Sequence, residues 1–171
     1  MTGDRHEKDA RGPTWVLAGA SVGVPVDPRG PSWRPEAGMR LVLVEDNVDI
    51  RETLSELLAL DGYCVASASD GPQGVIRIVA ERPEVALVDV GLPGFDGYEV
   101  ARRARERLGD ELALIAMTGY AQDEDRERSL DAGFDDHVVK PVSIDELGAA
   151  IERTLRRKAD GRVPAAGAGG S

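Results

Sequence analysis

Five short apolar runs alternate along the chain with longer amphipathic stretches, and this alternation limits the possible folds more than any other feature. The runs are rich in Val, Ile, Leu and Ala, as buried strands are. They span residues 40–44, 63–67, 84–88, 112–117 and 135–139. Neighbouring parallel strands need a crossover, which an intervening helix supplies. The pattern therefore predicts a doubly wound α/β fold, with five parallel strands and helices on both faces of the sheet.

Local signals place several of the helices and one strand residue. Leu54, Leu57 and Leu58 fall at helical spacing, which places them on one helix face. Two capping-box patterns, in residues 96–99 and 143–146, each pair a helix-capping residue with a glutamate three positions later. Cys64 is interpreted as a buried strand residue.

Charge and cysteine content exclude several classes of protein. The 171 residues include 21 Lys and Arg against 31 Asp and Glu, which gives a formal charge of −10. Such an acidic chain argues against direct binding of nucleic acid or of an anionic membrane surface, since both need a basic field. The longest uncharged apolar stretch, residues 15–26, falls short of the roughly 20 residues that span a bilayer. With one cysteine there is no internal disulfide, so the expected location is the cytoplasm.

Composition divides the chain into a body and two tails. Residues 1–38 contain 5 Pro and 6 Gly, a content typical of a disordered leader, and Met39 is an alternative translation start. Residues 39–158 form the expected folded domain. Residues 159–171 are rich in Gly and Ala and are expected to be a flexible tail too short for an output domain.

Polar residues follow the predicted strands where each one ends. Glu45 and Asp46 follow the first, Asp89 ends the third, Thr118 follows the fourth and Lys140 the fifth. In an open α/β sheet these ends meet at the ligand-binding edge. Carboxylates held together repel one another unless a cation neutralises them, and an oxygen-only set favours Mg²⁺. One carboxylate could then attack a phosphoryl group to give an aspartyl-phosphate.

Four motifs occur together in one order. They are LVLVEDN (41–47), LVDVGLPGFDGYEV (87–100), AMTGY (116–120) and VVKP (138–141). In this order and spacing they resemble the receiver domain of response regulators in two-component phosphorelays, especially single-domain receivers and those of hybrid sensor kinases. The resemblance covers about residues 39–157 and implies a flavodoxin-like (βα)5 fold with strand order 2-1-3-4-5.

The resemblance assigns a role to each acidic residue. Asp89 matches the phosphoacceptor, which takes a phosphoryl group from a histidine kinase or a phosphotransfer protein. Asp46 matches the principal Mg²⁺ ligand, and Glu45 the second acid, acting through water. The backbone carbonyl of Gly91 would complete the protein ligands of the metal.

The remaining motif residues match switch and tuning positions. Thr118 matches the hydroxyl that turns towards the phosphoryl group, and Lys140 matches the lysine that pairs with it. The bond to Pro141 is expected to be cis. Gly119 keeps the approach to Asp89 open, and Tyr120, like Gly91, is expected to tune hydrolysis of the phosphoryl group.

One position departs from the family pattern. Three residues before Lys140 the family usually has Tyr or Phe, a ring that swings with the threonine, whereas this chain has His137. Two interpretations stay open: the imidazole swings in place of the ring, or His137 is an exposed strand residue without a switching role.

Two classes of function and one variant follow. The leading hypothesis is a phosphorylation-controlled interaction module, not an enzyme with free substrates, whose phosphorylated form changes binding to a downstream protein. A homodimer that depends on phosphorylation is left open. The alternative is a Mg²⁺-dependent phosphohydrolase working through an aspartyl-phosphate, but that class wants a second acid two residues after Asp89, where Gly91 stands. The third interpretation is a receiver fragment of a larger hybrid kinase.

Overall fold

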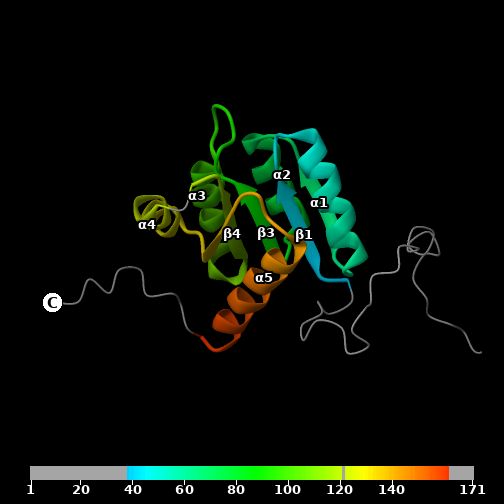
Figure 1. Cartoon of the computed structure of the whole chain (residues 1–171). Coiled ribbons are helices and arrows are strands. Elements are labelled where there is room, and N and C mark those ends of the chain that lie inside the picture. The colour runs from blue at the N-terminus through cyan, green and yellow to red at the C-terminus, as the bar shows by residue number, and fades with distance from the viewer. Residues whose placement is uncertain (1–37, 121, 162–171) are drawn as a thin grey trace, which may run out of the picture. The chain divides into compact units, whose positions relative to one another are not determined.

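A computed structural model describes residues 38–120 and 122–161 (Figure 1). In chain order the elements are β1 (Arg40–Val44), α1 (Val48–Leu60), β2 (Cys64–Ala68), α2 (Gly71–Glu81), β3 (Val85–Asp89), α3 (Gly97–Leu108), the short 3-10 helix η2 (Gly109–Glu111), β4 (Ala113–Thr118), α4 (Asp123–Ala132), β5 (Asp136–Val139) and α5 (Ile144–Ala159). The expectations for the leader and for most of the tail fall on residues 1–37 and 162–171, which lie outside the described residues.

The strands form one parallel sheet in the order β2-β1-β3-β4-β5. This order and the alternation of strands with helices confirm the predicted doubly wound α/β fold. The chain reverses its direction of winding at β1, so the carboxyl ends of β1 and β3 lie side by side at the switch point, where open α/β sheets bind ligands.

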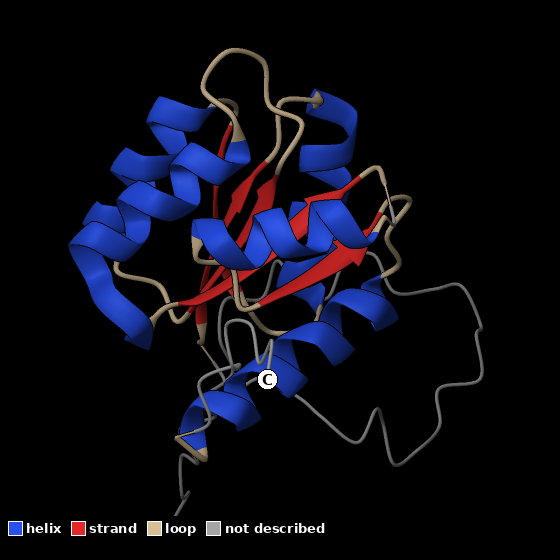
Figure 2. Ribbon diagram, turned by 90° about the vertical axis from the view of Figure 1, so that its left-hand side faces the viewer, coloured by secondary structure: helices blue, strands red, loops and turns tan. Residues whose placement is uncertain are grey.

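Helices cover both faces of the sheet (Figure 2). Successive strand residues point to opposite faces. Val42 and Val44 of β1 belong to the core beneath α2, α3 and α4, whereas Leu41 and Leu43 belong to the core beneath α1 and α5. Strands buried on both faces have near-continuous apolar sequences, which is why their positions could be predicted from the sequence.

Strand register fixes which residues meet at the carboxyl edge. Val44 of β1 pairs with Val88 of β3, and the residues that follow them, Glu45 and Asp89, are both acidic and therefore lie at the ends of neighbouring strands. Asp89 pairs with Met117 of β4, and Thr118 pairs with Val139, the residue before Lys140. The order of strands thus brings together groups that are far apart in the sequence.

Side-chain caps begin the helices that lead away from this edge. Asn47 Oδ1 accepts a 3.1 Å hydrogen bond from the Ile50 N–H at the start of α1. Asp96 accepts from the Glu99 N–H at the start of α3. At α5 both bonds of the Ser143 capping box form. Both predicted capping positions are confirmed as helix starts.

Three local predictions need correction. Four of the five strands begin one residue later than predicted, and β2, β3 and β4 also end one residue later, so that Thr118 lies within β4 rather than after it. Leu54 and Leu58 are buried, but Leu57 is 40% exposed because it lies beside the stripe that packs on the sheet. Cys64 is exposed rather than buried, since it is the first residue of the edge strand β2.

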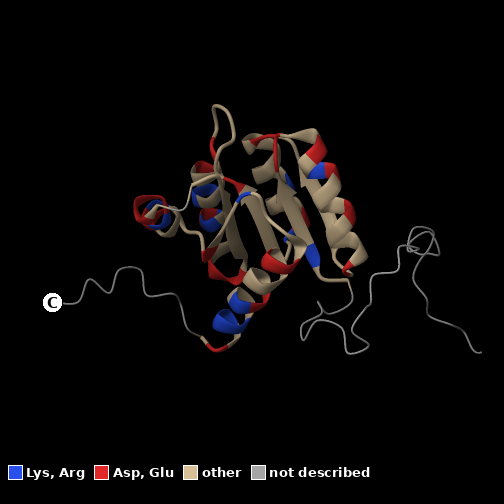
Figure 3. Cartoon of the chain, viewed as in Figure 1, with Lys and Arg blue, Asp and Glu red and all other residues tan. Residues whose placement is uncertain are grey.

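Charged residues are frequent along α4 and in the last turns of α5 (Figure 3). Arg153 and Arg157 of α5 both pair with Asp136 of β5, at 2.6 and 2.9 Å. Asp135 pairs with Arg105 of α3 and with Lys158 of α5. The basic end of α5 is therefore engaged by acids of the same domain. Among the helices of residues 38–161, none has the length and apolar character needed to cross a membrane.

Candidate functional site

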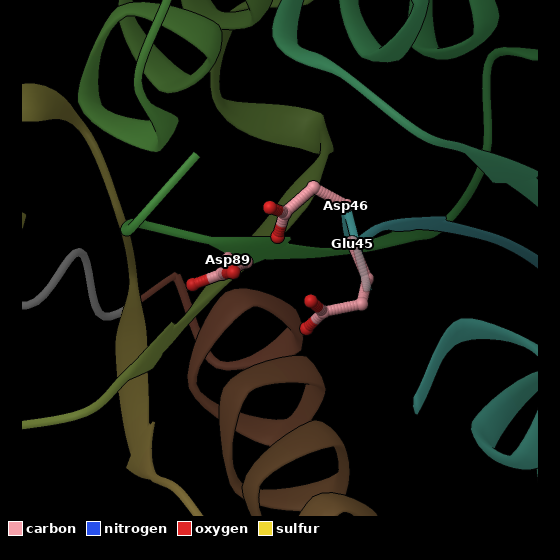
Figure 4. Close-up of side chains that lie close together, drawn as sticks. All are labelled: Glu45, Asp46 and Asp89. Atoms are coloured by element: carbon pink, nitrogen blue, oxygen red, sulfur yellow. The ribbon is translucent and has the colours of Figure 1, made fainter. Parts of the chain in front are cut away.

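Three carboxylates meet at the carboxyl edge of the sheet (Figure 4). Glu45, Asp46 and Asp89 each offer an oxygen, and these oxygens all lie within 4.8 Å of one another. Glu45 and Asp89 are 1% and 6% exposed, whereas Asp46 is open to solvent. The predicted acidic cluster is therefore present, with two of its acids buried and the third, Asp46, exposed at the surface. Such a set of oxygen donors is a candidate site for a hard cation.

Lys140 places its ammonium against the two buried acids. Its Nζ lies 2.6 Å from Glu45 Oε2 and 3.1 Å from Asp89 Oδ2. Burial raises the pKa of the Glu45 carboxyl above its ordinary value, and the charge of Asp89 adds to the rise, although Lys140 opposes it. Burial lowers the pKa of Lys140, but its contacts with both acids outweigh burial and leave that pKa raised. The lysine therefore stays charged.

Backbone groups hold the remaining carboxylate oxygens. Asp89 Oδ1 accepts a 2.9 Å hydrogen bond from the Gly91 N–H, and Glu45 Oε1 accepts a 3.1 Å bond from the Asn47 N–H. A Cβ at Gly97 would lie 2.3 Å from the Asp89 carbonyl oxygen. Only glycine therefore lets α3 begin against the end of β3, which fixes the backbone beneath Asp89.

Thr118 is turned towards its own loop. Its hydroxyl donates to the Tyr120 carbonyl oxygen at 3.1 Å and accepts from the Tyr120 N–H at 3.2 Å. The threonine is 3% exposed, whereas the Tyr120 side chain is 72% exposed. The hydroxyl thus ties an exposed loop residue to the end of β4, next to the acidic cluster.

Other expected positions lie around the cluster without a contact that assigns their role. The Lys140–Pro141 peptide bond is cis, as expected. His137 is half-buried in β5, and its backbone N–H donates to Asp136 Oδ1. A Cβ at Gly119 would meet nothing within 4 Å. The switching role of His137 and the tuning roles of Gly119 and Tyr120 stay predictions, as does metal ligation by the Gly91 carbonyl.

Sequence reasoning missed Arg51 on the first turn of α1. Its Nη1 donates to the carbonyl oxygens of Glu45 at 2.8 Å and of Asp46 at 3.4 Å. The arginine therefore fixes the backbone of both acids. The available signal was its position one helical turn after the cap, where a long side chain can reach back over the loop.

Residues 41–152 match the model of the response regulator receiver domain, and this match covers well over half of the chain. The chain belongs to the response regulator receiver domain family. As a receiver domain, it is a module of two-component phosphorelay signalling.

Relatives of the receiver domain agree with this assignment. The response regulator MprA of Mycobacterium avium is 38% identical over 119 residues, which cover 70% of this chain and 52% of the relative. MprA of Mycobacterium leprae gives the same values. The chain thus spans about half the length of the curated relatives that it matches.

Solved structures show the same fold. The receiver domain of the sensor histidine kinase PA1611 from Pseudomonas aeruginosa, solved with magnesium in its active-site cleft, is 35% identical with a TM-score of 0.64. It covers 70% of this chain and 99% of its own. A CheY-like receiver protein from Methanospirillum hungatei is 30% identical with a TM-score of 0.65, covering 72% of this chain and 99% of its own.

Proposed function

We propose that Asp89 is the phosphoacceptor of this receiver domain and takes its phosphoryl group from a phosphohistidine of a histidine kinase or phosphotransfer protein. The observation that carries the proposal is the position of the Asp89 carboxylate at the switch point, with acids on one side and Lys140 3.1 Å away. A nucleophile between a cation-binding set and a fixed ammonium suits phosphoryl transfer, in which electrostatic positioning supplies most of the catalysis.

The acidic cluster fits a magnesium ion as cofactor. Asp46 and Asp89 would hold it, with Glu45 and the Gly91 carbonyl as further ligands, and all of these donors are oxygens, as Mg²⁺ prefers. When bound, Mg²⁺ offsets the repulsion between the carboxylates and the phosphoryl oxygens. The solved receiver domain of PA1611 holds magnesium in its active-site cleft, which supports the same cofactor here.

The chain's own residues would carry the transfer. An Asp89 oxygen attacks phosphorus, a P–O bond forms, and the P–N bond to the donor histidine breaks with its electron pair left on the imidazole. Lys140 already contacts Asp89 and would hydrogen-bond an oxygen of the transferred group without changing its charge. Gly91 N–H and Gly97 keep the nucleophile in place.

Thr118 would pass the change to the surface. In the unphosphorylated structure both hydrogen bonds of its hydroxyl go to Tyr120. A hydroxyl that turns to the phosphoryl group must give up these bonds, which frees the Tyr120 backbone to change conformation. The exposed loop after β4 would then present a different surface to a downstream protein.

Acetyl phosphate with Mg²⁺, followed by intact-mass measurement, tests the proposal. Wild type should gain one phosphoryl mass and Asp89→Ala none. Asp70→Asn is the matched control, because Asp70 also follows a strand of the same sheet but caps α2 instead. The control should be phosphorylated like wild type. A wild type without added mass, or an Asp89→Ala variant that gains it equally, would overturn the assignment.

A further inference from the structure

A second polar pocket lies at the carboxyl end of the edge strand β2, between the starts of α1 and α2. Its volume is about 300 Å³, and it is lined by Arg51, Ser67, Ala68, Ser69, Gln73 and Arg77. None of these residues belongs to the acidic cluster. The pocket therefore forms a separate feature of the carboxyl edge.

The lining consists mainly of hydrogen-bond donors that the protein does not use. Within the described part of the chain, neither serine hydroxyl and no atom of the Gln73 side chain has a protein hydrogen-bond partner. The backbone N–H of Gln73 is taken by the cap residue Asp70, at 2.8 Å. Residues that carry two hydroxyls, an amide and two guanidinium groups thus line one pocket.

The charge of the lining is positive. No carboxylate lines the pocket, although the domain as a whole is acidic. Arg77 has one ion pair, with Glu81 on the next turn of α2 at 3.6 Å, and both side chains are largely exposed. Exposed pairs of this kind are weak, so Arg77 can turn to a ligand at little cost.

We propose that this pocket binds a phosphate group, either free phosphate or the phosphate of a small monoester. Guanidinium groups match the oxygens of a tetrahedral anion, and serine hydroxyls and an amide add neutral donors around it. The absence of a lining acid disfavours a metal ion. The volume exceeds the needs of phosphate alone, which leaves room for the first atoms of an ester group.

Arg51 connects this pocket with the acidic cluster. Its Nη1 holds the carbonyl oxygens of Glu45 and Asp46, and Arg51 also lines the pocket. A guanidinium group has five donors in a rigid plane, so it can bind an anion while keeping these bonds. A bound phosphate group would therefore order the side chain that fixes the backbone of both acids.

Titration of the full chain with inorganic phosphate, followed by amide NMR, tests the pocket. EDTA keeps the acidic cluster free of metal, so that the cluster repels the anion, and constant ionic strength holds the screening of charges unchanged during the titration. We expect saturable shifts at Ser67, Ser69 and Gln73, and at least fivefold weaker binding in Arg77→Gln. Arg126→Gln is the control, because Arg126 is exposed on α4 and has no ion pair among the described residues. It should bind like wild type.

Two further arms complete the test. Glycerol phosphate in place of inorganic phosphate should shift the same amides, and tighter binding would identify a monoester as the ligand, whereas weaker binding would identify free phosphate. Asp89→Ala should keep the full response, which separates this pocket from the proposed phosphoacceptor. Shifts that grow without saturation, or that are the same in Arg77→Gln, would overturn the proposal.

Discussion

Lys140 Nζ donates a 2.6 Å hydrogen bond to Glu45 Oε2 across 95 residues of sequence. Glu45 is 1% exposed and Lys140 has 22% of its side chain exposed, so the acid depends on this lysine for compensation of its charge. The lysine also contacts Asp89, which we propose as the phosphoacceptor. One ammonium group therefore serves both the stability of the domain and its reactive carboxylate.

Lys140→Met should destabilise the metal-free domain. The substitution removes the cation and leaves the buried Glu45 carboxylate without its ion pair, a loss that costs about 2–4 kcal/mol. Urea unfolding at pH 7 in EDTA measures the difference in free energy of unfolding. The double variant Glu45→Gln/Lys140→Met should recover more than half of the loss, because the uncompensated charge is gone. Losses that simply add would show that the pair does not interact.

Glu45 should make the metal-free domain less stable as pH rises. Burial raises the pKa of Glu45 in the folded state, so from about pH 4.5 upward the folded chain holds a proton that the unfolded chain has lost. Stability from this group is present at low pH and is lost as pH rises through the folded-state pKa. Urea unfolding from pH 4.5 to 8 should show wild type falling relative to Glu45→Gln. A constant difference between the two would contradict the raised pKa.

The elements and the acidic cluster could be predicted because they depend on local patterns and on topology. A strand buried on both faces is a continuous apolar run, and the carboxyl ends of parallel strands must share one edge. Asp89 and Lys140 therefore had to approach one another once the fold was recognised. Strand ends were less certain, since a polar residue such as Thr118 can continue a strand without changing its apolar pattern.

Other features depend on side-chain conformations that no sequence pattern encodes. The Thr118 side chain adopts the rotamer in which its hydroxyl bonds to Tyr120 rather than facing Asp89, and this is one of several possible rotamers. The bonds of Arg51 to the carbonyl oxygens of Glu45 and Asp46 are another case. Exposure of Cys64 is a different case, because the predicted strand order already placed β2 at the edge of the sheet, where the first residue of a strand can face solvent.

Arg105→Met should destabilise the domain without touching the acidic cluster. Arg105 donates to the carbonyl oxygens of Gly109, Leu112 and Gly133 at 2.7–2.8 Å, and to Asp135 at 2.6 Å. Its side chain is 15% exposed, and its loss would leave the part-buried carbonyl oxygens of Leu112 and Gly133 without this donor and Asp135 with only Lys158 and the Leu114 N–H, at a cost of about 3 kcal/mol.

Arg107→Met is the matched control for this variant. Arg107 lies on the same helix but is exposed, so its loss should change the free energy of unfolding by less than about 0.5 kcal/mol. Urea unfolding of both variants measures the contrast. Equal costs would mean that the hydrogen bonds of Arg105 contribute no net stability.

Asp46→Asn should weaken Mg²⁺ binding by about tenfold or more, because it removes the exposed carboxylate at the mouth of the cluster. Binding to the folded state alone raises stability by about 1.4 kcal/mol at ten times the dissociation constant. Thermal unfolding of wild type should therefore shift upward with Mg²⁺ and return with EDTA, whereas Asp46→Asn should respond only at much higher concentrations. Asp70→Asn, the capping acid of α2, should respond like wild type. An unchanged Mg²⁺ response in Asp46→Asn would exclude Asp46 as a ligand. Other oxygens at the carboxyl edge would then have to hold the metal.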